Sequence, residues 1–182
     1  SVYNGTGNYT DRAYGSAANG NGIYVTGRSA PDTGIDSADF VTLCLNKTTG
    51  VISWSDRYSN GLPDRANSIA ITPDGSIFVT GESVSAISGS DFATVMYNQN
   101  GNRIWVARYD GGISGEDVSR QVNVSSTGYL YVAGYASYNS ANQFDGSLLK
   151  YCPTPAASAG ADKSICKGLS TTLNGSGTGT FL

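Results

Sequence analysis

A short apolar phrase recurs three times along the chain, about fifty residues apart. It reads GIYVTG, SIFVTG and YLYVAG, and the three copies end at Gly27, Gly81 and Gly134. These glycines are 54 and 53 residues apart. A fixed period of this length is typical of a repeat architecture, in which each unit buries its apolar face only against its neighbours. The repeat constrains the fold more than any other feature of the sequence.

A second phrase follows each copy of the first. It reads DFVTLCLN from Asp39, DFATVMYN from Asp91 and DGSLLKYC from Asp145, with starting points 52 and 54 residues apart. In the first two units the runs VISWSDRY and RIWVARY come next, each carrying a tryptophan and a tyrosine. The repeated unit is therefore much longer than eight residues.

The clearest unit contains four segments with the character of β-strands. They lie at 67–72, 76–81, 91–98 and 103–109, and each is rich in β-branched or aromatic residues. DG and NG pairs supply the positive φ that short hairpin loops require. Four antiparallel strands in about 52 residues match one blade of a β-propeller. A β-sandwich does not repeat at four-strand intervals, and a β-helix has much shorter repeats.

The composition excludes several classes of function. The chain has 182 residues, of which 24 are glycine, 12 are tyrosine and none is histidine. Catalytic triads that use histidine and zinc sites with histidine ligands are therefore excluded within this chain. The 11 basic residues are scattered, which argues against nucleic acid as a partner. No apolar run approaches the roughly 20 residues that a membrane helix needs, so we expect no membrane insertion.

We predict an all-β fold, a β-propeller built of four-stranded antiparallel blades. About three blades lie in this chain, and we expect them to be part of a larger ring; closure by several copies is the alternative. The start of the chain aligns with the end of a fourth strand, and the third unit stops after its third strand. The predicted divisions are propeller blades at 1–152, with repeats at about 11–63, 64–115 and 116–152 and with 1–10 as the last strand of a preceding or shared blade, a linker at 153–161, and the start of a β-sandwich module at 162–182.

The repeated units resemble the bacterial repeats called SBBP, for seven-bladed β-propeller. The resemblance covers roughly residues 1–151 and rests on the two phrases and the Trp-Tyr strands, with Gly146 as a departure where that family has phenylalanine. The later run AGADKSICKGLSTTLNGSG resembles the opening of immunoglobulin-like or PKD-like modules of large bacterial surface proteins. The resemblance implies an extracellular or cell-surface protein, exported by the type IX route, without a general catalytic motif.

The repeated carboxylates have a structural and a chemical interpretation. Asp39, Asp91 and Asp145 occupy the same place in every unit, which favours a turn or strand-entry role over a unique catalytic role. Asp32, Asp36 and Asp39 offer several oxygens in one loop, as calcium prefers, although their spacing does not fit an EF-hand. We favour a solvated acidic loop and expect no cofactor, with calcium as the alternative.

The aromatic strands also allow two interpretations. Trp54 and Trp105, with Tyr58 and Tyr109, could stack against sugar rings if they were exposed. Their repetition at matched positions predicts packing between blades instead.

Two further sites are candidates for covalent modification. Cys152 and Cys166 flank the linker and could form a disulfide, whereas the resemblance implies that Cys166 pairs with a cysteine further downstream. Cys44 aligns with other strand residues and is expected to be a free thiol. Ser37 lies in an Asp-Ser-Ala triplet of the kind to which some surface-exporting bacteria attach O-glycans.

The predicted function is that of a non-catalytic propeller, acting as an adhesion or assembly scaffold within a multi-module surface protein. Its expected partners are other modules or surface proteins of the same cell envelope, and glycans. The alternative is a carbohydrate-binding or glycan-active propeller whose site lies outside this chain or at its edge. Fold alone does not decide between these functions.

Overall fold

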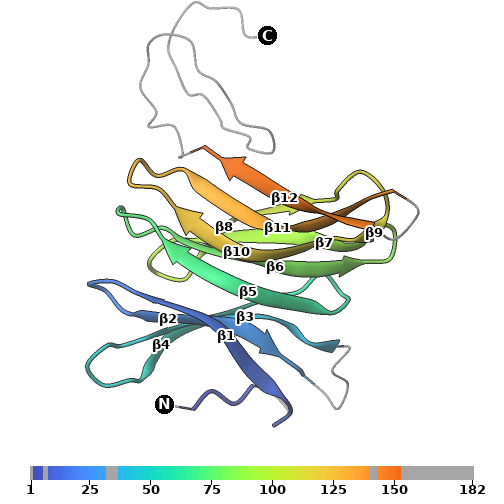
Figure 1. Cartoon of the computed structure of the whole chain (residues 1–182). Coiled ribbons are helices and arrows are strands. Elements are labelled where there is room, and N and C mark those ends of the chain that lie inside the picture. Colours follow the sequence, from blue (N-terminus) through green and yellow to red (C-terminus); the bar gives the residue numbers. More distant parts are fainter. Residues whose placement is uncertain (1, 6–7, 32–36, 140–142, 153–182) are drawn as a thin grey trace, which may run out of the picture.

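The computed structural model describes residues 2–5, 8–31, 37–139 and 143–152 (Figure 1). This part of the chain is all-β and contains no α-helix, so it also has no helix of the length and apolar character needed to cross a membrane. The strands are β1 (Asp11–Ala18), β2 (Ile23–Ser29), β3 (Asp39–Leu45), β4 (Ile52–Tyr58), β5 (Asp64–Ile71), β6 (Ile77–Ser85), β7 (Gly89–Tyr97), β8 (Arg103–Tyr109), β9 (Gly115–Glu116), β10 (Val118–Val124), β11 (Leu130–Asn139) and β12 (Gln143–Tyr151).

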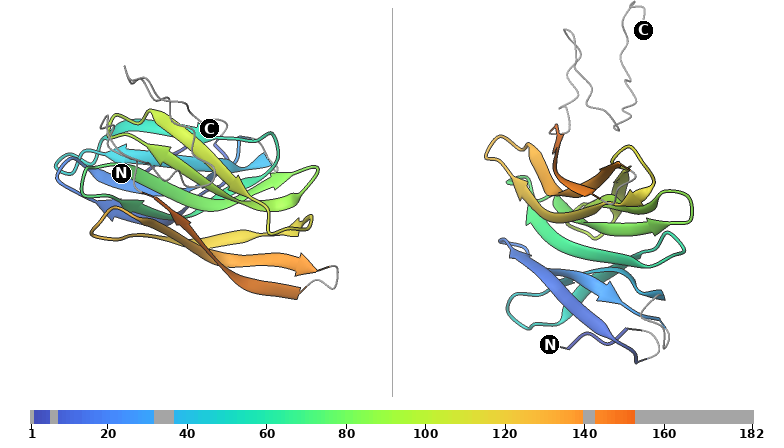
Figure 2. Two further views of the ribbon diagram at one scale, coloured as in Figure 1. Left: turned by 90° about the horizontal axis from the view of Figure 1, so that it is seen from above. Right: turned by 45° about the vertical axis from the view of Figure 1, so that its right-hand side comes forward.

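The strands form three antiparallel sheets, and each sheet holds one copy of the repeated phrase. The orders are β1-β2-β3-β4 in the first sheet, β5-β6-β7-β8 in the second and β10-β11-β12 in the third. The short strand β9 adds a parallel pairing to β7. Figures 1 and 2 show the sheets stacked in chain order, with the second between the other two. The first strands β1, β5 and β10 are neighbours in this stack.

The glycine that ends each phrase faces a bulge in the first strand of its sheet. All three first strands carry an irregularity at the same place in the register. A Cβ atom would lie 1.8 Å from a carbonyl oxygen of that strand at Gly27, 1.9 Å at Gly81 and 2.0 Å at Gly134. No side chain fits at such distances, so the bulge requires glycine at these positions.

The threonine of the phrase has a recurring role in the first two sheets. Thr26 lies 3.2 Å from Thr42 on the neighbouring strand, and Thr80 lies 3.2 Å from Thr94, measured between hydroxyl oxygens. Thr26 and Thr80 each also donate to a backbone carbonyl at 3.1 Å. These buried hydroxyls are therefore satisfied within the sheet.

Side chains of the second sheet alternate between two apolar cores, as the two-residue period of a strand dictates. The first core lies between the first and second sheets and consists of Tyr24, Phe40, Cys44, Tyr58, Ala66, Ile69, Ile77, Val79, Ala93, Val95 and Tyr97. The second core lies between the second and third sheets and consists of Phe78, Phe92, Met96, Val122, Leu130, Val132 and Tyr151. The second sheet is thus covered on both faces.

A tryptophan of each fourth strand connects its sheet to the next. The ring centroid of Trp54 lies 6.0 Å from that of Tyr24 in its own sheet and 5.9 Å from that of Tyr97 in the second sheet. Trp105 has the same place between the second and third sheets, 5.9 Å and 5.7 Å from its two aromatic neighbours. The prediction that both tryptophans pack between units is confirmed.

Equivalent phrase residues differ in burial at one end of the stack. Ile77 and Leu130 are buried, whereas Ile23 is 39% exposed. The reason is that no sheet in the described part of the chain covers the outer face of the first sheet. The three residues therefore have the same place in their sheets, and they differ in burial because only Ile77 and Leu130 are covered by an adjacent sheet.

The connection into each sheet also repeats. The first strands of the first two sheets begin with Asp11 and Asp64, and Asp117 immediately precedes β10. Each of these carboxylates accepts a hydrogen bond from a backbone N–H of the preceding segment; the donors are Gly5, Asn60 and Gly111, in that order. Residues 2–5 form no strand in the described structure, yet Gly5 follows Tyr3 by two residues, as Asn60 follows Tyr58 and Gly111 follows Tyr109.

Replacing the phrase glycine should test the bulge. Gly81→Ala is expected to destabilise the protein by about 3 kcal/mol, because the new methyl group would overlap a backbone carbonyl. Gly20→Ala is the matched control, since a Cβ at Gly20 meets nothing within 4 Å. Urea unfolding followed by circular dichroism would measure both, and equal effects of the two changes would contradict the steric explanation.

Candidate functional site

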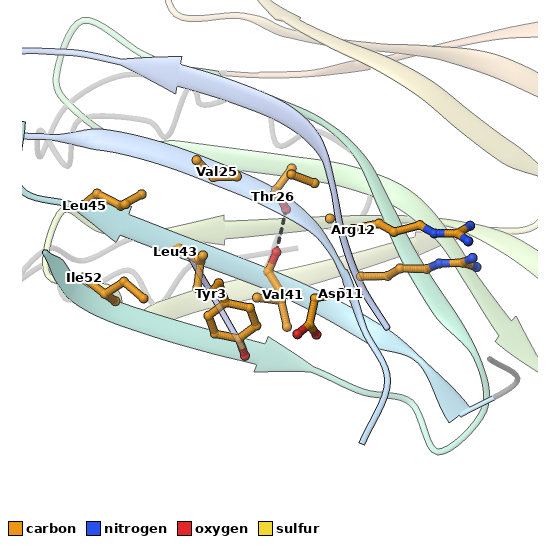
Figure 3. A pocket seen from close by; sticks show the side chains of 12 residues that line it. Tyr3, Asp11, Arg12, Val25, Thr26, Val41, Leu43, Leu45 and Ile52 are labelled. Atoms are coloured by element: carbon orange, nitrogen blue, oxygen red, sulfur yellow. Dashed lines mark hydrogen bonds between the residues drawn. The ribbon is translucent and has the colours of Figure 1, made fainter. Parts of the chain in front are cut away.

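A pocket of about 230 Å³ lies on the outer face of the first sheet (Figure 3). Strands β2, β3 and β4 supply its apolar wall. The apolar residues that line it are Tyr3, Val25, Val41, Leu43, Leu45 and Ile52. In Figure 3 the ring of Tyr3 lies beside Leu43 and Val41, while Arg12 extends away at the opposite end. The pocket is thus an apolar surface with a charged edge.

Two arginines and Asp11 supply the charged groups at the edge of this pocket. Arg12 on β1 and Arg28 on β2 are directly opposite each other in the strand register. Arg12 is exposed and Arg28 is half-buried, with a buried Nε that has no hydrogen-bond partner in the described structure. The same two positions in the second sheet hold Arg65 and Glu82, which form an ion pair at 2.6 Å.

The repeated carboxylates of the third strands are held by arginines of the fourth strands. Arg57 lies 3.0 Å from Asp39, and Arg108 lies 2.7 Å from Asp91. Each guanidinium also donates to a serine of the second strand, so that it joins three strands of its sheet. Asp145, the third copy, is exposed. This geometry supports the structural interpretation of the repeated aspartates.

A cluster of three carboxylates lies where the second and third sheets meet. One oxygen each of Asp91, Asp110 and Asp117 lies within 4.8 Å of the others, and Arg108 pairs with the first of them. Burial raises the pKa of Asp117, and the neighbouring carboxylates add to this effect, against two backbone N–H donors. At the equivalent junction between the first and second sheets, Ser59 takes the place of Asp110.

Of the three aspartates in the calcium hypothesis, only Asp39 lies in the described part of the chain. Asp39 is engaged with Arg57, as stated above, and it is buried. Asp32 and Asp36 lie outside the described residues, so the loop of three aspartates stays a prediction.

The candidate modification sites are only partly described by the structure. Cys44 is a free, buried thiol, as predicted. Cys152 ends the described part of the chain, and Cys166 lies outside it, so their pairing stays a prediction. Ser37 is half-buried, and its glycosylation is likewise untested.

Two features were missed when the sequence was interpreted as repeats alone. Arg12 and Arg28 replace an Arg–Glu pair, and Asp110 replaces a serine. Both are visible when the units are aligned, because they are positions where one copy changes the charge. A repeat pattern reports the residues that the units share, so a position that differs in one unit carries no signal in it.

Comparison with known proteins adds no assignment. Neither the family models nor the curated proteins that were searched contain a match to this chain. The resemblance to SBBP repeats and to immunoglobulin-like modules therefore remains an expectation.

The Asp110 position should control the pH dependence of stability. A carboxyl whose pKa is raised by folding destabilises the protein once it ionises, so stability falls as pH rises through its folded pKa. Asp110→Ser removes one repelling charge, lowers the pKa of Asp117 and should raise the melting temperature at pH 7 by about 1–2 °C. The gain should shrink toward pH 4; a gain that is equal at both pH values would exclude the electrostatic cause.

The Asp91–Arg108 pair should matter more than an exposed ion pair. The side chain of Asp91 is only 6% exposed, so Arg108→Gln leaves a buried charge unpaired and should cost about 2–3 kcal/mol. Arg103→Gln is the control, because Arg103 pairs with Asp56 near the surface and should cost less than about 1 kcal/mol. Chemical denaturation gives the free energy of unfolding of both variants, and equal losses would contradict a special role for the buried pair.

Proposed function

We propose that this chain is part of a β-propeller that acts as a non-catalytic adhesion or assembly scaffold in a multi-module protein. The observation that carries this proposal is that one interface is used twice, with matched tryptophans, and that both outer faces of the stack carry the apolar residues of the same interface. Sheets stacked in this way gain stability from each neighbour and need a ring or further sheets to cover their ends.

The outer face of the first sheet supports the presence of a further sheet. On this face Ile23 is 39% exposed and Val25 is half-buried, whereas their equivalents Ile77 and Val79 are fully buried against the first sheet. An apolar surface of this kind marks an interaction site in a soluble protein. A four-stranded sheet is the partner that covers the same residues elsewhere in the chain.

The third sheet offers the complementary opening. It has three described strands, and its last strand β12 has no partner on its outer edge in the described structure. On its outer face Leu148 is 66% exposed and Phe144 is 48% exposed. A fourth strand and a following sheet would cover them, as β8 and the third sheet do for the second sheet. The segment around Tyr3, which matches the end of a fourth strand, has the sequence for this role.

The scaffold role follows from how the polar residues are used. In the first two sheets the recurring carboxylates of the third strands are bound by arginines, and the buried threonines bond one another. In these two sheets the repeated polar groups are therefore engaged in joining strands, which supports a structural use of the repeat. A cell-surface location and export by the type IX route belong to this proposal through the resemblance alone.

One observation favours the alternative, a carbohydrate-binding propeller. Tyr135 and Phe144 form an edge-to-face pair at 5.0 Å on the outer face of the third sheet, where rings can stack against a sugar. Binding on a glycan array without turnover would support this alternative. Hydrolysis of a polysaccharide panel by the purified protein, lost on changing a single carboxylate, would overturn the non-catalytic proposal.

Matched substitutions on the covered and uncovered faces test the interface. Val25→Lys should change the melting temperature of this chain by less than about 2 °C and reduce its concentration-dependent association. Val79→Lys, at the equivalent covered position, should prevent folding because it buries a charge without a partner. Circular dichroism and light scattering coupled to size exclusion measure both. Unfolding of both variants, or association that is unchanged in Val25→Lys, would argue against an interface on the outer face.

A further inference from the structure

Arg12 and Arg28, at the edge of the pocket on the first sheet, lie where the second sheet has an arginine and a glutamate. In the second sheet, Arg65 and Glu82 are opposite each other and form an ion pair at 2.6 Å. In the first sheet, Arg12 and Arg28 occupy these positions. Like charges directly opposite each other on neighbouring strands destabilise a sheet. The arrangement therefore calls for a negative charge from outside the sheet.

Acids in the described part of the chain do not supply this charge. Arg12 and Arg28 form no hydrogen bond or ion pair with another described residue, and the buried Nε of Arg28 has no acceptor. Glu82 is within electrostatic range of Arg28, but it is already bound to Arg65 and also interacts with Arg120. An unpaired guanidinium nitrogen that is buried is costly, and an acceptor would remove the cost.

We propose that Arg12 and Arg28 together bind an oxyanion. Two neighbouring guanidinium groups offer planar sets of N–H donors that match the oxygens of a carboxylate or a phosphate. Both arginines line the pocket of about 230 Å³ together with Asp11, whose carboxylate already accepts a hydrogen bond from the Gly5 N–H, and the wall beyond these charged groups is largely apolar. The site therefore suits an anionic group that is attached to an apolar stem.

In the assembled propeller the oxyanion is the carboxylate of an acidic side chain on the adjoining sheet; this assignment rests on the proposed function. Opposite charges already meet across both junctions of this chain. Glu82 of the second sheet is within electrostatic range of Arg28 in the first sheet and of Arg120 in the third, and both arginines act to lower the pKa of its carboxyl. A covering sheet that follows the same rule presents an acid to Arg12 and Arg28.

Inorganic phosphate is the probe for the site on the 182-residue chain. At an ionic strength matched with chloride, phosphate should raise the melting temperature by about 2–4 °C when it is present well above its dissociation constant. Arg28→Glu recreates the Arg–Glu pair of the second sheet, although it places a carboxylate within range of Glu82, so it should fold and abolish the phosphate-specific gain. Arg12→Glu should do the same.

Arg103→Gln is the matched control, because Arg103 is an arginine outside the pocket, and its loss should leave the phosphate response intact. Equal phosphate responses in the wild type and Arg28→Glu would overturn the site, since phosphate also stabilises proteins through exclusion from their surface. If the glutamate variants fail to fold, shifts of the Nε–Hε signals of Arg12 and Arg28 during phosphate titration give the answer. Unchanged signals would equally overturn the site.

The source of the anion is tested separately. In a longer native polypeptide that supplies a covering sheet, the phosphate response should be lost because a side chain fills the site. A response that persists there would identify a free anion as the ligand and would reject the adjoining acid. If the 182-residue chain responds to phosphate but the native polypeptide supplies no covering sheet, the oxyanion site stands and the propeller assignment fails.

Discussion

Face-to-face packing between neighbouring sheets is the constraint on which this structure depends. A single sheet of four short strands has two apolar faces and cannot bury either of them by itself. The second sheet solves this with Ile77 and Val79 against one neighbour and Phe78 and Met96 against the other. Each tryptophan then adds an aromatic contact across the junction. Stability in such a stack is a sum over junctions, so each sheet depends on having neighbours.

The repeated phrase is the sequence form of that constraint. Alternating apolar residues serve two different cores, and the threonine satisfies its hydroxyl inside the sheet. The final glycine has a separate cause, because the bulged first strand places its carbonyl oxygen where a Cβ would be, as at Gly81. The bulge therefore explains a residue that packing against a neighbour does not require. The same six residues therefore meet two requirements: packing between neighbouring sheets and room for the bulge within one sheet.

The strand order, the packing of the tryptophans between sheets and the free thiol of Cys44 could be predicted from the sequence, because alternation and repetition indicate them directly. The extent of the second strand in the cleanest unit was predicted less well. The strand continues to Ser85, and its last residue pairs with Gly89, although the segment looked like a polar loop. Serine is neither clearly apolar nor clearly charged, so the alternation that marks a strand is lost there and the pairing of these residues could not be predicted. The position of Arg12 directly opposite Arg28 follows from the register between the strands, which the repeat pattern does not contain.

The two ends of the stack depart from what terminal repeats normally do. Capping repeats replace the apolar outer face with polar residues, so that the end of the stack is soluble. Here the apolar Ile23 is 39% exposed at one end, and Leu148 is 66% exposed at the other. The arginine pair adds charge that no described acid pairs with, at the edge of the outer face of the first sheet; by the alternation of β2, the Arg28 side chain leaves the strand on the opposite face from Val25. An apolar surface with an unbalanced charge at its edge has the form of half an interface, in which apolar packing supplies affinity and the charge selects the partner.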